Sequence, residues 1–219
     1  MKLQIIFATG NADKVREIRE ILADPDITVQ TMKEAGIAAS PEENGETFTD
    51  NARIKARAVA RLLVLHPECV QDPAVPVVIM SDDSGLCIDA LGGAPGIHSA
   101  RFMGHDTSYT VKMNALLARL KDVPDEKRTA RFTCAVAAIL PKSPFTGGPD
   151  GWEELTAAAS MEGVIAHSIR GAHGFGYDPF FYLPELRKTS AELTDREKNA
   201  ISHRGKAIRK IMQQISERL

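Results

Sequence analysis

The chain has 219 residues, of which 43% are hydrophobic and 26% are charged, a composition that excludes a disordered chain and suits one large domain or two lobes sharing a core. Its 27 basic and 29 acidic residues give a formal net charge of -2. No overall positive field therefore attracts nucleic acid, and we expect none as a partner; a polyanionic ligand has to be met locally.

The cysteines and the N-terminus indicate the compartment. Cys69, Cys87 and Cys134 are scattered and odd in number, which fits a reducing compartment and neither a disulfide framework nor a zinc site. The first residues hold too short an apolar stretch for a signal peptide, and no apolar run approaches the roughly 18 residues that span a membrane. We therefore expect a cytoplasmic protein with no membrane partner.

The first half of the chain alternates strand and helix patterns. Residues 3–8 predict a short buried strand, Asn11 a helix N-cap, and the apolar spacing after it a helix. Residues 27–32 predict a second strand. After a polar loop, Thr47 is expected to cap a long helix with an apolar stripe at Phe48, Ala52, Ala56, Val59, Leu62 and Leu63.

The second half continues this alternation. Residues 108–120 predict an amphipathic helix, and residues 130–140 and 154–169 predict strands on either side of a turn-rich loop. A terminal helix is expected to open with a capping box from Thr194 to Glu197. The predicted buried faces are Val111, Leu116, Leu117 and Leu120 in the former helix, and Ile201, Ile208, Ile211, Ile215 and Leu219 in the latter. With no repeat or linker, this order favours one α/β domain over residues 1–219, and the closely spaced last strands favour a mixed sheet.

Residues 8–14, ATGNADK, join the first strand to the first helix through Thr9, Gly10 and Asn11. Backbone N–H groups and the positive helix end face such a turn, and Lys14 lies on the first helical turn, so the arrangement suits a phosphate group. The P-loop pattern is absent, and Gly-Asn before a helix is commonly only a cap. The segment alone leaves both interpretations open.

Asp82 and Asp83 follow an apolar run, residues 77–80, where we expect a buried strand to end. Ligands of open α/β sheets gather beyond the carboxyl ends of strands, and Mg²⁺ takes one or two carboxylates together with phosphate oxygens. Because side chains alternate along an extended chain, one carboxylate can hold a cation or water while the other braces the loop. An Asx turn stabilised by Ser84 and Gly85 is the structural alternative.

The loop and helix of residues 41–60 carry Glu42, Glu43 and Lys55. A loop lets the paired carboxylates point freely, and the lysine lies on the polar side of the helix. Acidic loop residues are usually solvated, and a lysine there is commonly a surface residue. Neither side chain is assigned a function from this segment alone.

Residues 173–181, HGFGYDPFF, concentrate aromatic side chains between glycines. Phe175 and Tyr177 offer flat apolar faces that suit a heterocyclic base, with Asp178 accepting hydrogen bonds. An ordinary turn with aromatic anchors in the core is equally compatible with the pattern.

The last helix carries Lys198, His203 and Arg204. Lysine and arginine bind phosphate as a compact charge and a planar fork of donors, respectively. A solvated basic helix face is the ordinary alternative. Ser84 has no histidine close in sequence to activate it, so the sequence gives little support for serine nucleophilic catalysis.

Five segments together resemble the inosine triphosphate pyrophosphatase family in order and spacing, from Leu3 to about Ile211: ATGNADK, ETFTDNARIKA, DDSGLCIDALGGAPGIHSARF, GFGYDPFF and AELTDREKNAISHRGKA. The chain is similar to the bacterial dITP/XTP pyrophosphatases of that family. The resemblance implies hydrolysis of ITP, dITP and XTP to the nucleoside monophosphate and pyrophosphate, which removes deaminated purines from the nucleotide pool. It also implies an Mg²⁺-dependent homodimer.

The same resemblance implies a fold and a set of site residues. The fold is an elongated, two-lobed α/β structure around a long mixed sheet flanked by helices, with the nucleotide in a cleft between the lobes. Asp83 is the implied proton acceptor, and Glu43 and Asp83 are the implied metal ligands. The implied substrate contacts are Thr9, Gly10, Asn11, Ala12, Asp13, Lys14, Lys55, Ser84, Phe175, Gly176, Tyr177, Asp178, Lys198, His203 and Arg204.

These roles make physical sense for a triphosphate, whose negative charges repel an attacking water. Mg²⁺, Lys14 and Lys55 would neutralise the phosphates, and Asp83 would orient or deprotonate the water. Base selection is expected to use the six-keto group and N1–H, which adenine lacks.

The chain departs from the usual pattern of this family in two respects. Segments 63–76 and 141–154 are longer or more irregular than in compact relatives, and Ser81 stands where alanine is common. The resemblance therefore implies nothing about the surface or dimer contacts of this chain.

Two rival functions stay open. One rival is a pyrophosphatase of pyrimidine triphosphates. The other is a nucleotide-binding regulator without catalysis, which the intact set of Glu43, Asp83 and Lys14 disfavours.

Overall fold

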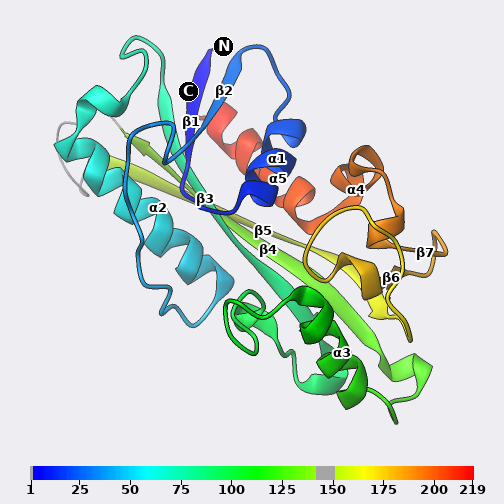
Figure 1. The fold of residues 1–219 in the computed structure, drawn as a ribbon. Coiled ribbons are helices and arrows are strands. Elements are labelled where there is room, and N and C mark those ends of the chain that lie inside the picture. Colours follow the sequence, from blue (N-terminus) through cyan, green and yellow to red (C-terminus); the bar gives the residue numbers. More distant parts are fainter. Residues whose placement is uncertain (1, 142–150) are drawn as a thin grey trace. The chain divides into compact units, whose positions relative to one another are not determined.

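The structure is a computed structural model that describes residues 2–141 and 151–219. Most of the turn-rich loop predicted after residue 140 lies outside the described residues. The strands and longer helices are β1 (Leu3–Phe7), α1 (Ala12–Ile21), β2 (Ile27–Thr31), α2 (Phe48–Leu65), β3 (Val77–Ile88), α3 (Tyr109–Arg119), β4 (Thr129–Pro141), β5 (Trp152–Ile165), β6 (Phe181–Leu183), β7 (Lys188–Thr189), α4 (Asp195–Ile201) and α5 (His203–Ser216) (Figure 1).

The described strands form one sheet in the order β2-β1-β3-β4-β5-β6-β7. Strand β1 runs parallel to both β2 and β3, whereas β6 is antiparallel to β5 and β7. A mixed sheet flanked by helices confirms the predicted α/β class. The two-lobed shape and its cleft stay a prediction.

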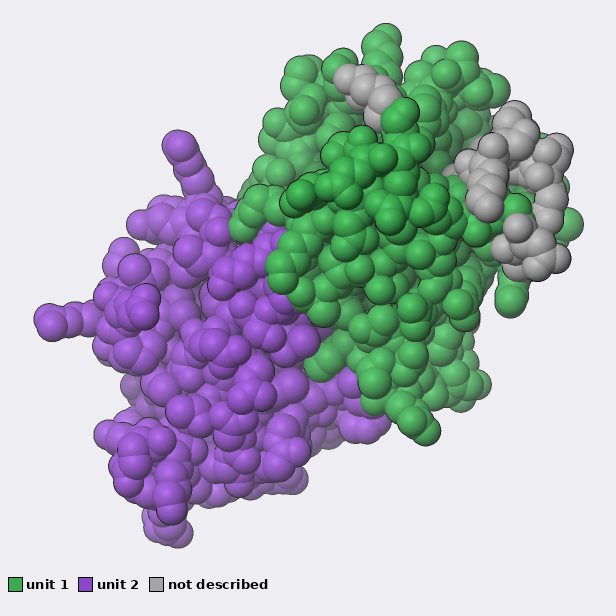
Figure 2. Space-filling view, turned by 180° about the vertical axis from the view of Figure 1, so that it is seen from behind, with its two compact units in different colours: residues 1–83, 135–158, 207–219 green, residues 84–134, 159–206 purple. Residues whose placement is uncertain are grey.

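The chain divides into two compact units, which Figure 2 distinguishes by colour. The first unit comprises Met1–Asp83, Ala135–Ala158 and Ala207–Leu219, and the second comprises Ser84–Cys134 and Ala159–Lys206. The boundary passes through β3, so the consecutive residues Asp83 and Ser84 belong to different units. Each unit has its own core.

Helix α2 covers one face of the sheet in the first unit. Its predicted stripe of Ala52, Ala56 and Val59 is fully buried against strand residues that include Ile6 and Ile79. Right-handed connections place α1, between β1 and β2, on the other face, and Figure 1 shows α1 and α2 on opposite sides of the sheet. Odd-numbered residues of β3 therefore face α2, and even-numbered residues face away from it.

The core of the second unit gathers aliphatic and aromatic side chains from α3, β3 to β6 and the segment before β6. Leu116 and Leu120 are buried there as predicted, with Leu117 packed partly against them. Val111, however, is 49% exposed, and Met113 is buried in its place. The prediction was wrong at this residue because the first turn of α3 presents position 111 to solvent.

Three other expectations need correction. Strand β3 does not end before the aspartates but continues through them to Ile88, so no Asx turn forms at Ser84 and Gly85, and Asp82 braces no turn. The predicted terminal helix is interrupted at Ser202, whose extended backbone separates α4 from α5. Leu219 is 48% exposed and lies beyond the buried face of α5.

Within the described residues, no helix is both long enough and apolar enough to cross a membrane.

Candidate active site

The turn between β1 and α1 is organised by Asn11, the predicted N-cap. Its side-chain oxygen accepts hydrogen bonds from the N–H groups of Asp13 and Lys14 at 2.9 and 3.1 Å, and its own N–H donates to the Thr9 hydroxyl. The cap interpretation of this turn is thus confirmed. Within the described residues, the N–H groups of Gly10 and Ala12 have no hydrogen-bond partner, which leaves backbone donors for an anion.

A hollow of about 720 Å³ opens beside this turn. Thr9, Gly10 and Ala12 line it together with Arg16 and Lys33, among others. The turn therefore lies beside a space that can hold a ligand group, and the side chains that line this space include the cations Arg16 and Lys33.

Lys14 is held in place by Asp82. The two groups form an ion pair of 3.0 Å in which the lysine side chain is 14% exposed and the aspartate is fully buried. Asp82 is an even-numbered residue of β3 and so faces α1, which carries Lys14. A buried carboxylate with a cationic partner is a positioning element, because the charge fixes where the lysine nitrogen lies.

Asp83 projects from the opposite face of β3, toward α2. Its Oδ2 accepts a hydrogen bond of 3.0 Å from the side chain of Asn51, and its Oδ1 lies 3.6 Å from Lys55 Nζ. Ser81, two residues earlier, faces the same helix, and its hydroxyl donates to the Ala52 carbonyl. The predicted alternation of the two aspartates is therefore observed, although both lie inside a strand.

Glu43 reaches the same lysine from the loop before α2. Its Oε2 lies 3.2 Å from Lys55 Nζ, so the carboxylates of Glu43 and Asp83 converge on a single ammonium group. No hydrogen bond or ion pair of Glu42 lies within the described part of the chain, and its side chain is exposed. Of the two adjacent glutamates, only Glu43 approaches Lys55 together with Asp83, whereas the side chain of Glu42 is exposed.

The environment of Asp83 perturbs its ionisation. Burial raises the pKa of its carboxyl above the ordinary value, and the positive charges of Lys55 and Lys14 and the hydrogen bond from Asn51 offset part of that rise. A carboxylate with a raised pKa and three stabilising neighbours is poised to accept a proton.

The converging carboxylates fit a magnesium ion. Mg²⁺ is commonly bound by one or two carboxylates and completed by substrate phosphates and water, and both Glu43 and Asp83 already face a common cation, Lys55. In the described residues, no group of three or more metal-binding side chains gathers. The two carboxylates of Glu43 and Asp83 therefore suit an ion whose other ligands are phosphate oxygens of the substrate and water.

In the second unit, Asp178 and Lys198 form a buried ion pair of 2.6 Å. Asp178 Oδ2 also accepts the N–H of Phe175 at 2.9 Å. Gly174 allows this arrangement because a Cβ there would lie 2.3 Å from Asp178 Oδ2. The loop that carries the aromatic side chains is thus anchored to a buried ion pair.

Two cations lie close to the ring of Phe175. Lys198 Nζ is 5.0 Å and the Arg204 guanidinium carbon 5.6 Å from its centroid. Arg204 also donates to the Ser84 hydroxyl at 2.8 Å. The structure therefore brings together Ser84, Phe175, Lys198 and Arg204, which lie far apart in the sequence.

Tyr177 and His203 are held by other aromatic residues. Tyr177 is buried, donates from its hydroxyl to the Ser99 carbonyl at 3.0 Å and packs edge-on against Tyr109. The imidazole of His203 stacks on Phe132 with a centroid distance of 5.0 Å. Tyr177 anchors the loop in the core, and its role as a substrate contact stays a prediction, as does that of the neighbouring Gly176.

Sequence reasoning missed two contributors to this site, Asn51 and Phe132. Asn51 belongs to the buried face of α2, where an amide stands among alanines, and a polar residue on an apolar stripe was the available signal. Phe132 reads as an ordinary core residue of β4, so nothing in the sequence marked its stacking on His203.

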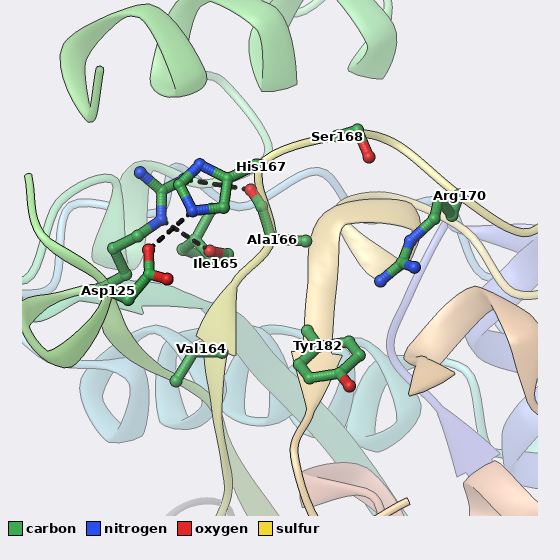
Figure 3. A pocket seen from close by; sticks show the side chains of 9 residues that line it. Asp125, Val164, Ile165, Ala166, His167, Ser168, Arg170 and Tyr182 are labelled. Carbon is green, nitrogen blue, oxygen red and sulfur yellow. Dashed lines mark hydrogen bonds and ion pairs between the residues drawn. The ribbon is translucent and has the colours of Figure 1, made fainter. Parts of the chain in front are cut away.

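A second hollow, of about 340 Å³, lies in the second unit beside the β5–β6 hairpin. Figure 3 shows its lining, with the His167 imidazole hydrogen-bonded to Asp125 on one side and Arg170 near the Tyr182 ring on the other. Its lining includes none of the predicted site residues.

Comparisons with known proteins find similarity over nearly the whole chain. The family model described as the Ham1 family matches residues 5–214. A dITP/XTP pyrophosphatase from Yersinia pseudotuberculosis is 44% identical over 214 residues, covering 98% of each chain, and one from Clostridium perfringens is 41% identical over 208 residues, covering 95% of each. A solved structure of a HAM1 protein from Coxiella burnetii superimposes with a TM-score of 0.80 at 35% identity, over 98% of this chain and 99% of that one.

Proposed function

Because this chain belongs to the Ham1 family, we propose that it hydrolyses dITP, XTP and ITP to the nucleoside monophosphate and pyrophosphate. Its relatives are named dITP/XTP pyrophosphatases. The observation that supports the chemistry best is the convergence of Glu43 and Asp83 on Lys55, with Asn51 donating to Asp83. The reaction would clear deaminated purines from the nucleotide pool.

The first unit carries the groups proposed to bind the phosphates. The N–H groups of Gly10 and Ala12 and the helix end at Asn11 donate to phosphate oxygens. Lys14, fixed by Asp82, and Lys55 add positive charge. The N–H groups of the turn and the ammonium group of Lys14 are in place before the substrate arrives, so they stabilise the charge that develops during the reaction without reorganising.

Asp83 is the proposed base. Burial raises the pKa of its carboxyl, and a base is more effective when its pKa lies nearer the working pH. It accepts a proton from a water molecule that attacks the α-phosphorus. The bond between the α-phosphorus and the bridging oxygen breaks, and pyrophosphate leaves with the electron pair.

Glu43 and Asp83 would hold Mg²⁺. When bound, the ion supplies charge neutralisation to the phosphates and lowers the pKa of a water ligand. Lys55 would then share the carboxylates with the ion, and its ammonium group is free to shift toward a phosphate because its stem is flexible.

The second unit carries the groups proposed to recognise the nucleobase. Phe175, with two cations near its ring, offers an aromatic surface for stacking, and Ser84 and Arg204 offer donors. Donors from His203 or Arg204 would favour the six-keto oxygen of hypoxanthine or xanthine, and leaving such a buried donor unpaired against adenine costs about 1–3 kcal/mol.

Three further parts of the proposal rest on the resemblance to inosine triphosphate pyrophosphatases and on composition. They are a homodimer, a cytoplasmic location and a single catalytic unit over residues 1–219. Sedimentation of the purified chain tests the first of these.

A substrate panel tests the proposed function and its rivals. We expect pyrophosphate to be released rapidly from ITP and XTP, slowly from GTP, dTTP and UTP, and hardly at all with a chelator present. Faster turnover of dTTP or UTP would favour the pyrimidine-specific rival. Tight ITP binding without any pyrophosphate would favour a regulator.

A further inference from the structure

Asn51 is a fully buried amide in the first turns of α2, and its two ends contact two different segments. Its Oδ1 accepts the N–H of Gly45 at 2.9 Å, and its Nδ2 donates to Asp83 Oδ2 at 3.0 Å. Gly45 belongs to the loop that carries Glu43, and Asp83 belongs to β3. One side chain therefore joins the segments of both proposed metal ligands.

The chemistry of the two contacts requires an amide. A backbone N–H needs an acceptor, and a carboxylate needs a donor; the asparagine side chain presents both groups on one short, neutral, planar amide. Aspartate would place a second negative charge against Asp83, and leucine would remove both hydrogen bonds. Glutamine is one methylene longer, in a position with no exposed surface.

Helix stability alone does not explain this residue. Asparagine is a weaker helix former than alanine, and its neighbours on the buried face, Ala52 and Ala56, are alanines. Both side-chain hydrogen bonds of Asn51 go outside the helix, to Gly45 and Asp83.

The contacts also determine which oxygen of Asp83 faces Lys55. Asp83 Oδ2 is engaged by Asn51, so Oδ1 is the atom that faces Lys55, the same ammonium that Glu43 approaches. The loop approaches Asn51 closely because Gly45 has no side chain: a Cβ there would lie 2.8 Å from Asn51 Oδ1 and 2.9 Å from its backbone N.

We propose that Asn51 is a positioning residue that sets the distance and orientation of the Glu43 and Asp83 carboxylates and thereby prepares a divalent-cation site. The inference rests on the proposed function, in which these carboxylates hold Mg²⁺. Asn51 itself contacts neither substrate nor ion.

Two variants test these contacts. Asn51→Leu removes both hydrogen bonds. Gly45→Ala is designed to displace the loop of Glu43 and to leave the hydrogen bond between Asn51 and Asp83. Val59→Ala, in the buried stripe of the same helix, is the matched control because it weakens packing without touching either carboxylate. Circular dichroism establishes that each variant is folded.

Binding of Mn²⁺ alone to the full chain, followed by its electron paramagnetic resonance signal, gives a readout independent of turnover. We expect Asn51→Leu to weaken Mn²⁺ binding by about 10–100-fold, the loss typical when a residue that orients metal ligands is removed. Gly45→Ala should weaken it less, and Val59→Ala should match the wild type. In steady-state assays, Asn51→Leu should lower kcat at saturating Mg²⁺ while KM for ITP changes little.

The outcomes separate the inference from the proposed function. Wild-type Mn²⁺ affinity in folded Asn51→Leu, or equal losses in Asn51→Leu and Val59→Ala, would overturn the inference. If Asn51→Leu does not fold, unchanged affinity in Gly45→Ala overturns it. A wild-type chain that binds no Mn²⁺ overturns it too. Asn51-dependent Mn²⁺ binding in a chain that releases no pyrophosphate would sustain the inference and refute the function.

Discussion

The burial of the ion pair between Asp178 and Lys198 predicts how much the free energy of unfolding falls when the lysine is replaced. The two side chains are 3% and 4% exposed, with their charged atoms 2.6 Å apart. Lys198→Met leaves the carboxylate buried without its cation, a change that typically costs about 3–5 kcal/mol. The remaining hydrogen bond from the Phe175 N–H partly stabilises the charge, since bonds to charged groups contribute about 1.5–3 kcal/mol. We therefore expect a loss near the lower end, about 3 kcal/mol.

Urea unfolding followed by circular dichroism measures this loss. Asp178→Asn in the Lys198→Met background keeps an acceptor for Phe175 but removes the charge, and it should recover most of the stability, with a coupling energy of about 2 kcal/mol. Arg131→Met is the control, because it removes a cation from exposed pairs with Asp89 and Glu162 and should cost about 1 kcal/mol or less. A Lys198→Met loss no larger than that of Arg131→Met would refute the reasoning.

Three further predictions concern the first unit. Asp83→Asn should abolish pyrophosphate release while the circular dichroism spectrum is unchanged, and near-normal turnover would exclude Asp83 as the base. Asp82→Ala should free Lys14 from its fixed position and lower kcat/KM for ITP by up to about 100-fold, whereas unchanged kinetics would show that the ion pair only stabilises the fold. Hydrogen bonds from Arg19 lower the pKa of Glu34 from 4.5 to about 2, so this contribution to stability is present above about pH 4.5 and is lost as the pH falls toward 2; Glu34→Gln should remove it, by about 1 kcal/mol or less for so exposed a pair, in urea titrations at pH 6 and pH 3.

Local signals predicted much of the fold. Asn11, Thr47 and Thr194 each cap the helix that the sequence placed after them, because capping depends on a side chain and the few backbone groups next to it. Strands such as β1 and β4 were recognisable from continuous apolar runs. These features need no knowledge of distant residues.

The course of β3 was not predictable in the same way. A carboxylate pair normally marks the end of a buried strand, yet Asp82 and Asp83 lie inside one. They are tolerated because Lys14 and Asn51, from helices on opposite faces of the sheet, supply a charge and a hydrogen bond. Such partners become visible only when the chain is folded.

The break between α4 and α5 was missed for a related reason. Apolar residues continue at helical spacing through it, but the Ser202 hydroxyl accepts the N–H of Gly205 and starts a new helix. Strands β6 and β7, of 3 and 2 residues, are too short to show a period. The candidate site residues were proposed from their motifs, and their mutual contacts were not predicted.

Hydrolysis of dITP in ¹⁸O-labelled water tests the central claim most directly, because it reports which phosphorus the water attacks. The account predicts dIMP and pyrophosphate as products, with the label in dIMP alone and no reaction in Asp83→Asn. Label in pyrophosphate, or release of orthophosphate in place of pyrophosphate, would contradict it.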